Sequence, residues 1–256
     1  MKIATFNINH INKRLPNLLR WLKRSKPDVV CLQELKCETR SFPEQELLRA
    51  GYSAAWEGQK SWNGVAILSR ISQPIVTARK LPGDPSDTQA RYIEAAINGV
   101  LIACLYMPNG NPQPGPKFDY KMKWFSRLAR RATQLQKQGQ PVILAGDYNV
   151  APTELDIYPT KSWAKDALIQ PAPRKAFASL VKNGWRDSIR ELYGDERVYT
   201  FWTYWRNRYD RDDGLRLDHL LLNGSLADRL TAGGVDGDIR GEEGASDHAP
   251  VWIELR

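Results

Sequence analysis

The chain has 256 residues, of which 42% are hydrophobic and 26% are charged, so it can bury a large single core. Lysine and arginine outnumber aspartate and glutamate by 37 to 29, giving a net charge of +8. This excess favours a polyanionic partner, although a merely soluble basic protein has the same balance. No run approaches the roughly 18 apolar residues of a membrane span, and no secretory apolar segment follows the first residue. We therefore expect one domain over residues 1–256, cytoplasmic, or nucleoid-associated in a bacterium, with no membrane contact.

Short apolar runs bounded by turn residues predict eight buried strands. In chain order they occupy residues 3–8, 29–33, 64–69, 92–97, 100–107, 142–145, 217–222 and 250–255. An apolar face at helical spacing predicts a long helix from Phe118 to Leu135, and shorter helices are expected at residues 15–24, 44–50, 175–182 and 188–192. Strands that are apolar on both faces and interleaved with helices are typical of sheets covered by helices. This pattern alone does not distinguish one doubly wound sheet from two packed sheets.

Three cysteines are present, Cys31, Cys37 and Cys104, and the first and last lie inside apolar runs. An odd number without close spacing fits neither a disulfide framework nor a zinc site. We expect reduced, structural thiols.

Acidic residues stand at the ends of several apolar runs. Glu34, Asp147 and Asp218 each end such a run, and the pair Asp247 and His248 precedes the last predicted strand. Four strand edges therefore bring acidic groups to what we expect to be one rim. Burying carboxylates close together is costly unless a cation joins them. Oxygen ligands without clustered cysteine or histidine select Mg²⁺ or Mn²⁺, so we expect a hard divalent metal beside an acid–base pair.

Six short sequence words contain these residues and occur in one order along nearly the whole chain. They are Phe6-Asn7-Ile8-Asn9, Leu32-Gln33-Glu34-Leu35-Lys36, Tyr106-Met107-Pro108-Asn109-Gly110, Gly146-Asp147-Tyr148-Asn149-Val150, Leu215-Arg216-Leu217-Asp218 and Ser246-Asp247-His248. Together they resemble exonuclease III and the class II abasic-site endonucleases of the endonuclease/exonuclease/phosphatase superfamily. The resemblance implies an α/β fold of four layers, two packed β-sheets flanked by helices, as in DNase I.

The same resemblance implies an activity. It is Mg²⁺-dependent hydrolysis of duplex DNA on the 5′ side of an abasic site, with 3′-to-5′ exonuclease and 3′-phosphatase activity in the same site. The expected partners are abasic duplexes and DNA 3′ ends, bound by a monomer. The alternatives are a secreted DNase, a sphingomyelinase, an inositol-phosphate phosphatase or a catalytically inactive nucleic-acid-binding relative. The absence of a signal peptide and of paired cysteines disfavours the first, and the presence of every catalytic word disfavours the last.

Roles for the metal site and the acid–base groups follow from the resemblance. It implies that Glu34 is a metal ligand, with Asn7 and Asp247 close to the same metal. His248 contacts phosphate. Adjacent residues of a strand point to opposite faces, so Asp218 is a better partner for His248 than Asp247 is. Asp147 is the candidate general base, oriented by Asn149, and Tyr106 is its rival as base or phosphate ligand; a self-stabilised turn is the simpler reading of Asp147 and Asn149.

Further roles concern the DNA itself. Lys36, Arg91 and Asn109 match positions that touch the DNA backbone or the reacting phosphate, although isolated cationic side chains usually face solvent. Phe201 and Trp202, with Leu217, resemble the wall of a pocket for an extruded sugar that lacks its base. Aromatic-rich segments more often belong to the core. Extrusion suits an abasic nucleotide, because it has already lost stacking and pairing.

Overall fold

The apolar runs of the sequence form the interior strands of two six-stranded β-sheets in the computed structural model, which describes residues 1–256. The first sheet has the order β11 (Leu230–Val235), β12 (Val251–Leu255), β1 (Lys2–Asn7), β2 (Val29–Gln33), β4 (Val65–Ser69) and β3 (Ser53–Glu57). The second has the order β5 (Ile75–Ala78), β6 (Tyr92–Ile97), β7 (Val100–Tyr106), β8 (Val142–Asp147), β10 (Asp218–Leu222) and β9 (Arg186–Asp187).

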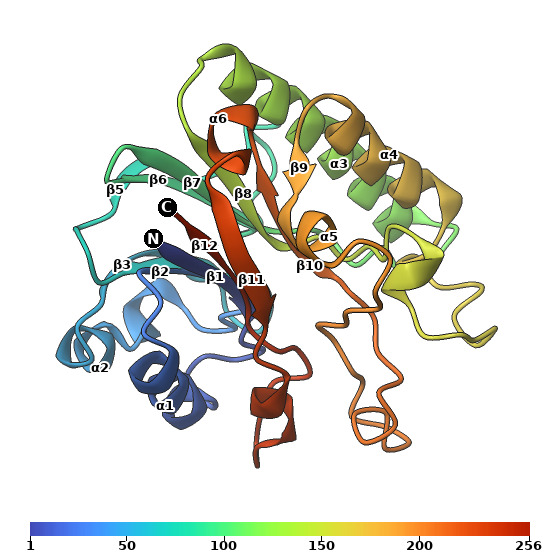
Figure 1. Cartoon of the computed structure of the whole chain (residues 1–256), viewed down its shortest axis with the longest axis horizontal. Coiled ribbons are helices and arrows are strands. Elements are labelled where there is room, and N and C mark those ends of the chain that lie inside the picture. Colours follow the sequence, from blue (N-terminus) through green and yellow to red (C-terminus); the bar gives the residue numbers. More distant parts are fainter.

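Four helices, α1 (Leu15–Ser25), α2 (Glu44–Arg49), α3 (Pro116–Lys137) and α4 (Pro171–Lys182), cover the outer faces of the two sheets. Two short helices, α5 (Ser188–Tyr193) and α6 (Gly224–Ala227), instead contribute Ile189, Leu226 and Ala227 to the core between the sheets. In Figure 1, α1 and α2 lie outside the first sheet and α3 and α4 lie outside the second. The predicted four-layer sandwich is confirmed, and no helix has the length and apolar character that a bilayer crossing requires.

Both faces of the interior strands are apolar because each face packs against a different layer. In β2, Val29 and Cys31 belong to the core between the two sheets, whereas Val30 and Leu32 join the core beneath α1 and α2. Side chains of a strand alternate between faces, so one continuous apolar run fills two cores. The three cysteines are buried and unpaired, as predicted.

The long helix α3 begins at Pro116, slightly earlier than the apolar periodicity predicts. Proline suits the first position of a helix because its missing N–H would lack a partner there in any case. Trp124, Phe125 and Leu128 on its inner face belong to the core against the second sheet. This helix supports β7 and β8 from outside, and both strands deliver residues to the site.

The strand register places the ends of five strands, β1, β2, β7, β8 and β10, at the same edge of the two sheets, here called the rim. In the parallel pair β1 and β2, Asn7 lies opposite Gln33, one residue before Glu34. In the second sheet, Asp147 lies opposite both Tyr106 of β7 and Asp218 of β10. Parallel neighbours end at the same edge of a sheet, so these side chains converge although they are far apart in the sequence.

Candidate active site

Asp147, Asp218 and His248 form a buried acid–base group at this rim. His248 Nδ1 lies 2.7 Å from Asp218 Oδ2, and His248 Nε2 lies 3.9 Å from Asp147 Oδ2. The pairing of His248 with Asp218 is the one predicted from the sequence. The Thr200 hydroxyl donates a hydrogen bond of 2.7 Å to the same Asp218 oxygen, which fixes the carboxylate behind the imidazole.

The charges of this group depend on one another. Burial alone would lower the pKa of His248, but the carboxylates of Asp218, Asp147 and Asp247 outweigh burial and raise it to about 10. Burial raises the pKa of the Asp147 carboxyl, and Asp218 adds to the effect while His248 opposes it. The imidazole is therefore a cation at neutral pH, and Asp147 is a stronger base than an exposed aspartate.

A tight backbone turn positions Asp147 at the end of β8. A Cβ on the preceding Gly146 would lie 1.9 Å from the Leu105 carbonyl oxygen, so only glycine allows the two strands to approach this closely. After the strand, the Asn149 backbone N–H donates to Asp147 Oδ1 at 2.8 Å, and the Asn149 side chain donates to the Met107 carbonyl at 2.8 Å. The Asn149 side chain also donates to Asp147 Oδ2 at 3.3 Å, so Asn149 holds both carboxylate oxygens and ties the loop to its neighbour.

Glu34 lies at the centre of a second group of polar side chains. Its Oε1 accepts hydrogen bonds of 2.9 Å from Asn7 Nδ2 and from the Tyr106 hydroxyl, and its Oε2 lies 2.7 Å from Lys36 Nζ. Burial alone would raise the pKa of Glu34, but Lys36 and the hydrogen bonds outweigh it and lower the pKa. The Asn7 amide also donates to Asp147 Oδ2 at 2.9 Å, so it links this group to the acid–base group.

Asp247 reaches the Glu34 group through Asn9, a residue that the sequence did not single out. Asn9 donates to Asp247 Oδ1 at 2.8 Å and accepts from Lys36 Nζ at 2.7 Å. Glu34, Lys36 and Asn9 all have positive φ angles, of 53°, 49° and 46°. Such backbone is costly for a residue other than glycine and is concentrated at functional sites. Asn9 stands two residues after Asn7, and this spacing is the feature of the sequence that could have indicated Asn9 as a site residue.

The donor set at this rim suits a hard divalent cation. Its carboxylates and amides supply oxygen atoms, and all three cysteines lie in the core. Candidate ligand atoms of Asp147, Asp218 and His248 lie within 4.8 Å of one another, and the buried Asp218 Oδ1 has no hydrogen-bond partner. Beside Glu34, the neutralising cation in this structure is the Lys36 ammonium. Asn7 turns its nitrogen toward the carboxylates and its oxygen toward Asn9 N, so a role as oxygen ligand requires the amide to rotate.

Tyr106 and Arg91 form one wall of the rim. The Arg91 guanidinium lies 4.6 Å from the centroid of the Tyr106 ring, an arrangement that holds both side chains. Burial and the negative charge of Glu34 raise the pKa of the Tyr106 phenol well above its ordinary value. The phenol is therefore a hydrogen-bond donor here. Asn109 is exposed next to this wall, and its amide donates to Asn149 Oδ1 at 3.3 Å.

The three predicted pocket residues differ in exposure. Phe201 is half-buried, and its ring lies 4.8 Å from the His248 ring. Trp202 and Leu217 are 5% and 1% exposed and belong to a small core that also contains Leu215. Of the three, Phe201 is therefore the one that presents an aromatic surface beside the acid–base group.

A buried lysine behind the site was not predicted. Lys121 is fully buried, and its Nζ donates to the backbone carbonyls of Asn149, Asn109 and, at 3.4 Å, Ala167. Burial lowers its pKa to about 7, although Asp147 and Asp166 oppose the shift. The sequence does contain a signal for it, because Lys121 stands three residues after Phe118 and so lies on the apolar face of a predicted helix. Lys121 connects the loops that carry Asn109 and Asn149.

A second buried network surrounds Arg216 and His219, which lie on either side of Asp218 in the sequence. Arg216 Nε lies 2.7 Å from Asp156 Oδ1, and Arg216 Nη1 lies 2.9 Å from Asp187 Oδ1 and 3.1 Å from His219 Nδ1. His219 Nε2 lies 3.1 Å from the Val150 carbonyl, so this nitrogen carries the proton and Nδ1 accepts from Arg216. Burial, followed by the charge of Arg216, lowers the pKa of His219 to about 4.

We expect this neutral histidine to make folding stability depend on pH. The folded pKa of about 4 lies below the ordinary 6.5, so protons bind preferentially to the unfolded chain between these values. Stability should therefore fall as pH drops from 6.5 toward 4, by about 3 kcal/mol at the limit. The free energy of unfolding in urea is measured against pH for the parent and for His219→Gln, and the difference between the two slopes gives the contribution of His219. Asp147 titrates in both proteins, so its contribution is the same in both slopes and does not affect the difference. Equal slopes would show that His219 does not contribute.

The fold and this site together define a hydrolase of phosphodiester bonds. The sequence model of the endonuclease/exonuclease/phosphatase family matches residues 4–248. Exodeoxyribonuclease III of Haemophilus influenzae is 33% identical over the whole of both chains, and the DNA repair nuclease APEX1 of Danio rerio is 31% identical over all of this chain and 82% of its own. The chain belongs to the endonuclease/exonuclease/phosphatase family and, within it, to the group that includes exodeoxyribonuclease III.

Solved structures agree with this assignment. An AP endonuclease from Archaeoglobus fulgidus superimposes with a TM-score of 0.95 at 34% identity, covering all of this chain and 99% of the other. A 3′-5′ exonuclease from Neisseria meningitidis gives the same TM-score and coverage at 38% identity. Neighbours with the same fold thus include enzymes named for two different activities.

Proposed function

We propose that this protein hydrolyses phosphodiester bonds in duplex DNA on the 5′ side of abasic sites, leaving a 3′-hydroxyl, and that the same site removes nucleotides and phosphates from 3′ ends. The observation that carries the proposal is the buried group of Asp147, Asp218 and His248, joined to Glu34 by the Asn7 amide. We further propose that the 256 residues act as one domain and as a monomer. The excess of basic residues supports a DNA partner.

Asp147 acts as the general base and His248 holds the reacting phosphate. An oxygen between His248 Nε2 and Asp147 Oδ2, which are 3.9 Å apart, can contact both. The imidazolium stabilises negative charge on the phosphate, and Asp147 takes the proton from water attacking in line. Because burial raises the pKa of Asp147 toward neutrality, its basicity suits that role, whereas the raised pKa of Tyr106 makes the phenol a donor. Asn149 orients the base, and Asp218 orients the imidazole.

A Mg²⁺ ion, with Mn²⁺ as a substitute, would be held by Glu34, with Asn7 and Asp247 close by. Bound there, the cation supplies positive charge that polarises the phosphate and eases departure of the leaving oxygen. The residues of the chain provide the rest: Lys36, Arg91 and Asn109 contact the DNA backbone around the reacting phosphate. Mg²⁺ usually binds through one or two carboxylates and keeps several waters, which suits a rim open to solvent.

Cleavage of a duplex with one internal abasic site tests the proposal directly. We expect a nick on the 5′ side of the lesion in the presence of Mg²⁺ and none after chelation, with the products resolved on a denaturing gel. A matched duplex with an intact nucleotide at that position is the control. Failure to cut the abasic duplex, together with release of phosphate from a 3′-phosphate end, would favour the second candidate. That candidate is a 3′-end-processing enzyme, like the 38% identical exonuclease.

Substrate choice gives a further expected result. Phe201 packs beside His248 but makes no hydrogen bond to the acid–base group, so Phe201→Ala should reduce discrimination more than chemistry. We expect the preference for abasic-site cleavage over 3′-end degradation of intact duplex to decrease. Expressed as a free-energy difference, the decrease should be ~1–3 kcal/mol, the range for one lost stacking contact. Both rates are measured on the parent and on the variant. An unchanged ratio would mean that Phe201 is core packing and that selectivity arises elsewhere.

A further inference from the structure

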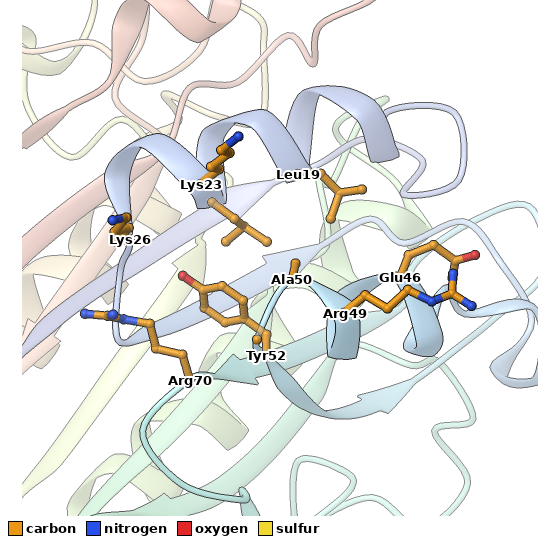
Figure 2. A pocket seen from close by; sticks show the side chains of 10 residues that line it. Leu19, Lys23, Lys26, Glu46, Arg49, Ala50, Tyr52 and Arg70 are labelled. Atoms are coloured by element: carbon orange, nitrogen blue, oxygen red, sulfur yellow. The ribbon is translucent and has the colours of Figure 1, made fainter.

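A groove opens between α1 and α2 on the outer side of the first sheet (Figure 2). Its volume is about 830 Å³, compared with about 640 Å³ for the cavity beside Tyr106. The floor is apolar, because Leu22 and Tyr52 are buried there, 2% and 3% exposed. The sides carry the cationic residues Lys23, Lys26, Arg49 and Arg70 and a single acidic residue, Glu46. The groove thus combines an apolar base with positively charged walls.

The groove lies at the end of the sheet opposite the active site. In the pairing of β2 with β4, Gln33 and Val65 are opposite each other at the active-site end, and Val29 and Ser69 are opposite each other at the groove end. Arg70 follows Ser69 directly. Five residues of strand at about 3.3 Å each separate the two ends by roughly 13–17 Å. The groove and the catalytic rim are therefore separate parts of the surface.

Two neighbouring arginines on α1 are neutralised, whereas three of the four groove cations are not. Arg20 and Arg24 pair with Glu242 and Asp238, each at 2.8 Å. By contrast, Lys23, Lys26 and Arg49 form no ion pair, and of the four cations in the groove only Arg70 does, with Asp28 at 2.8 Å. Three cations therefore face the groove without an acidic partner.

We propose that this groove is a docking site for an acidic peptide segment of a partner protein. Carboxylates of the segment face Lys23, Lys26 and Arg49, and one bulky apolar side chain packs on Leu19 and Ala50, the apolar lining residues that keep exposed surface. Single-stranded nucleic acid would share the charge complementarity, but it stacks its bases on exposed aromatic rings. The only ring in the groove, that of Tyr52, is 3% exposed, and its hydroxyl is bonded to the Pro27 carbonyl at 2.8 Å.

Stabilisation of the helix ends is by itself another reason for cationic residues at some of these positions. Lys23 lies in the last turn of α1 and Arg49 in the last turn of α2, where positive charge offsets the helix dipole. Lys182, the exposed last residue of α4, performs that role without a groove and forms no ion pair. It is the matched control that separates a helix-end effect from peptide binding.

The test measures fluorescence anisotropy of a short labelled peptide in which glutamates flank a phenylalanine and a leucine. We expect the parent to bind it in a salt-sensitive manner, and the double variant Lys23→Glu/Arg49→Glu to bind about tenfold more weakly or worse. Lys182→Glu should bind as the parent does, and nuclease activity should be unchanged in all three proteins. If the double reversal unfolds the chain, Lys23→Gln/Arg49→Gln gives the same comparison.

Three results would overturn the proposal. One is no peptide binding by the parent, and another is equal binding of the peptide by the parent and the groove variant. The third is displacement of the peptide by a short single-stranded oligonucleotide at a lower concentration than by unlabelled peptide, which would make the groove a nucleic-acid site. A peptide with glutamines in place of the glutamates is the probe control, and it should not bind.

Discussion

Replacing Asp147 by asparagine should lower turnover on an abasic duplex by about 10²–10⁴-fold, the range for loss of a general base. The substitution keeps the shape of the side chain and an oxygen that can accept from the Asn149 backbone N–H, now 2.8 Å from Asp147 Oδ1. It removes the ability to take a proton. DNA affinity should not fall, since a negative charge facing phosphate is lost. Single-turnover cleavage and a separate binding titration measure the two quantities.

Tyr106→Phe is the control for this assignment. It removes the hydroxyl that donates to Glu34 Oε1 at 2.9 Å but leaves the ring beneath Arg91. We expect a smaller loss than with Asp147→Asn, because a phenol whose pKa is raised is a donor and not a base. Should Tyr106→Phe abolish turnover while Asp147→Asn hardly changes it, the base would have been assigned to the wrong residue.

The sequence predicted the interior strands and missed the edges of the sheets. All eight predicted strands correspond to interior strands, whereas the four that were not predicted, β3, β5, β9 and β11, are the four edges. An edge strand pairs on one side only and needs little apolar surface. β5 has exposed residues in alternate positions, β9 contains only Arg186 and Asp187, and β11 contains two glycines. None of these gives the continuous apolar run by which interior strands were recognised.

The same runs could not distinguish two sheets from one. Val30 and Val29 are equally apolar, yet one faces helices and the other faces the second sheet. Hydropathy reports that a face is buried and not what buries it. The resemblance of the sequence words supplied the distinction, and the structure agrees with it.

Site residues could be predicted from the sequence where their chemical function restricts the residue type. Residues that only hold other groups in position could not be predicted. Glu34, Asp147 and His248 each lie within a recognisable word, and strand register brings the words together. Thr200 and Lys121 act on backbone atoms and on one carboxylate oxygen across 12 or more residues of chain, and no word contains either of them. Such partners are set by tertiary contacts, which a single sequence does not report.

Glu34→Ala should abolish most activity and the steep dependence of rate on Mg²⁺, while the protein stays folded. Glu34 is the carboxylate on which Asn7, Lys36 and Tyr106 converge, and its side chain remains 16% exposed, so it is reachable from solvent. We expect a loss larger than the roughly 10–100-fold that removing an outer hydrogen-bond partner of a metal ligand costs. Rate against Mg²⁺ concentration, and Mn²⁺ binding followed by electron paramagnetic resonance, are the two measurements.

Glu38→Ala is the matched control, because Glu38 pairs with exposed Arg40 at 2.8 Å on the same loop and lies outside the site. It should behave as the parent in both measurements. Loss of Mn²⁺ binding with Glu34→Ala, but not with Asp218→Asn, would put the cation beside Glu34, where Lys36 now supplies the positive charge. The reverse pattern would move it to the cluster of Asp147, Asp218 and His248, whose Oδ1 of Asp218 lacks a hydrogen-bond partner. Parent-like activity and Mn²⁺ binding in Glu34→Ala would remove Glu34 from the metal site altogether.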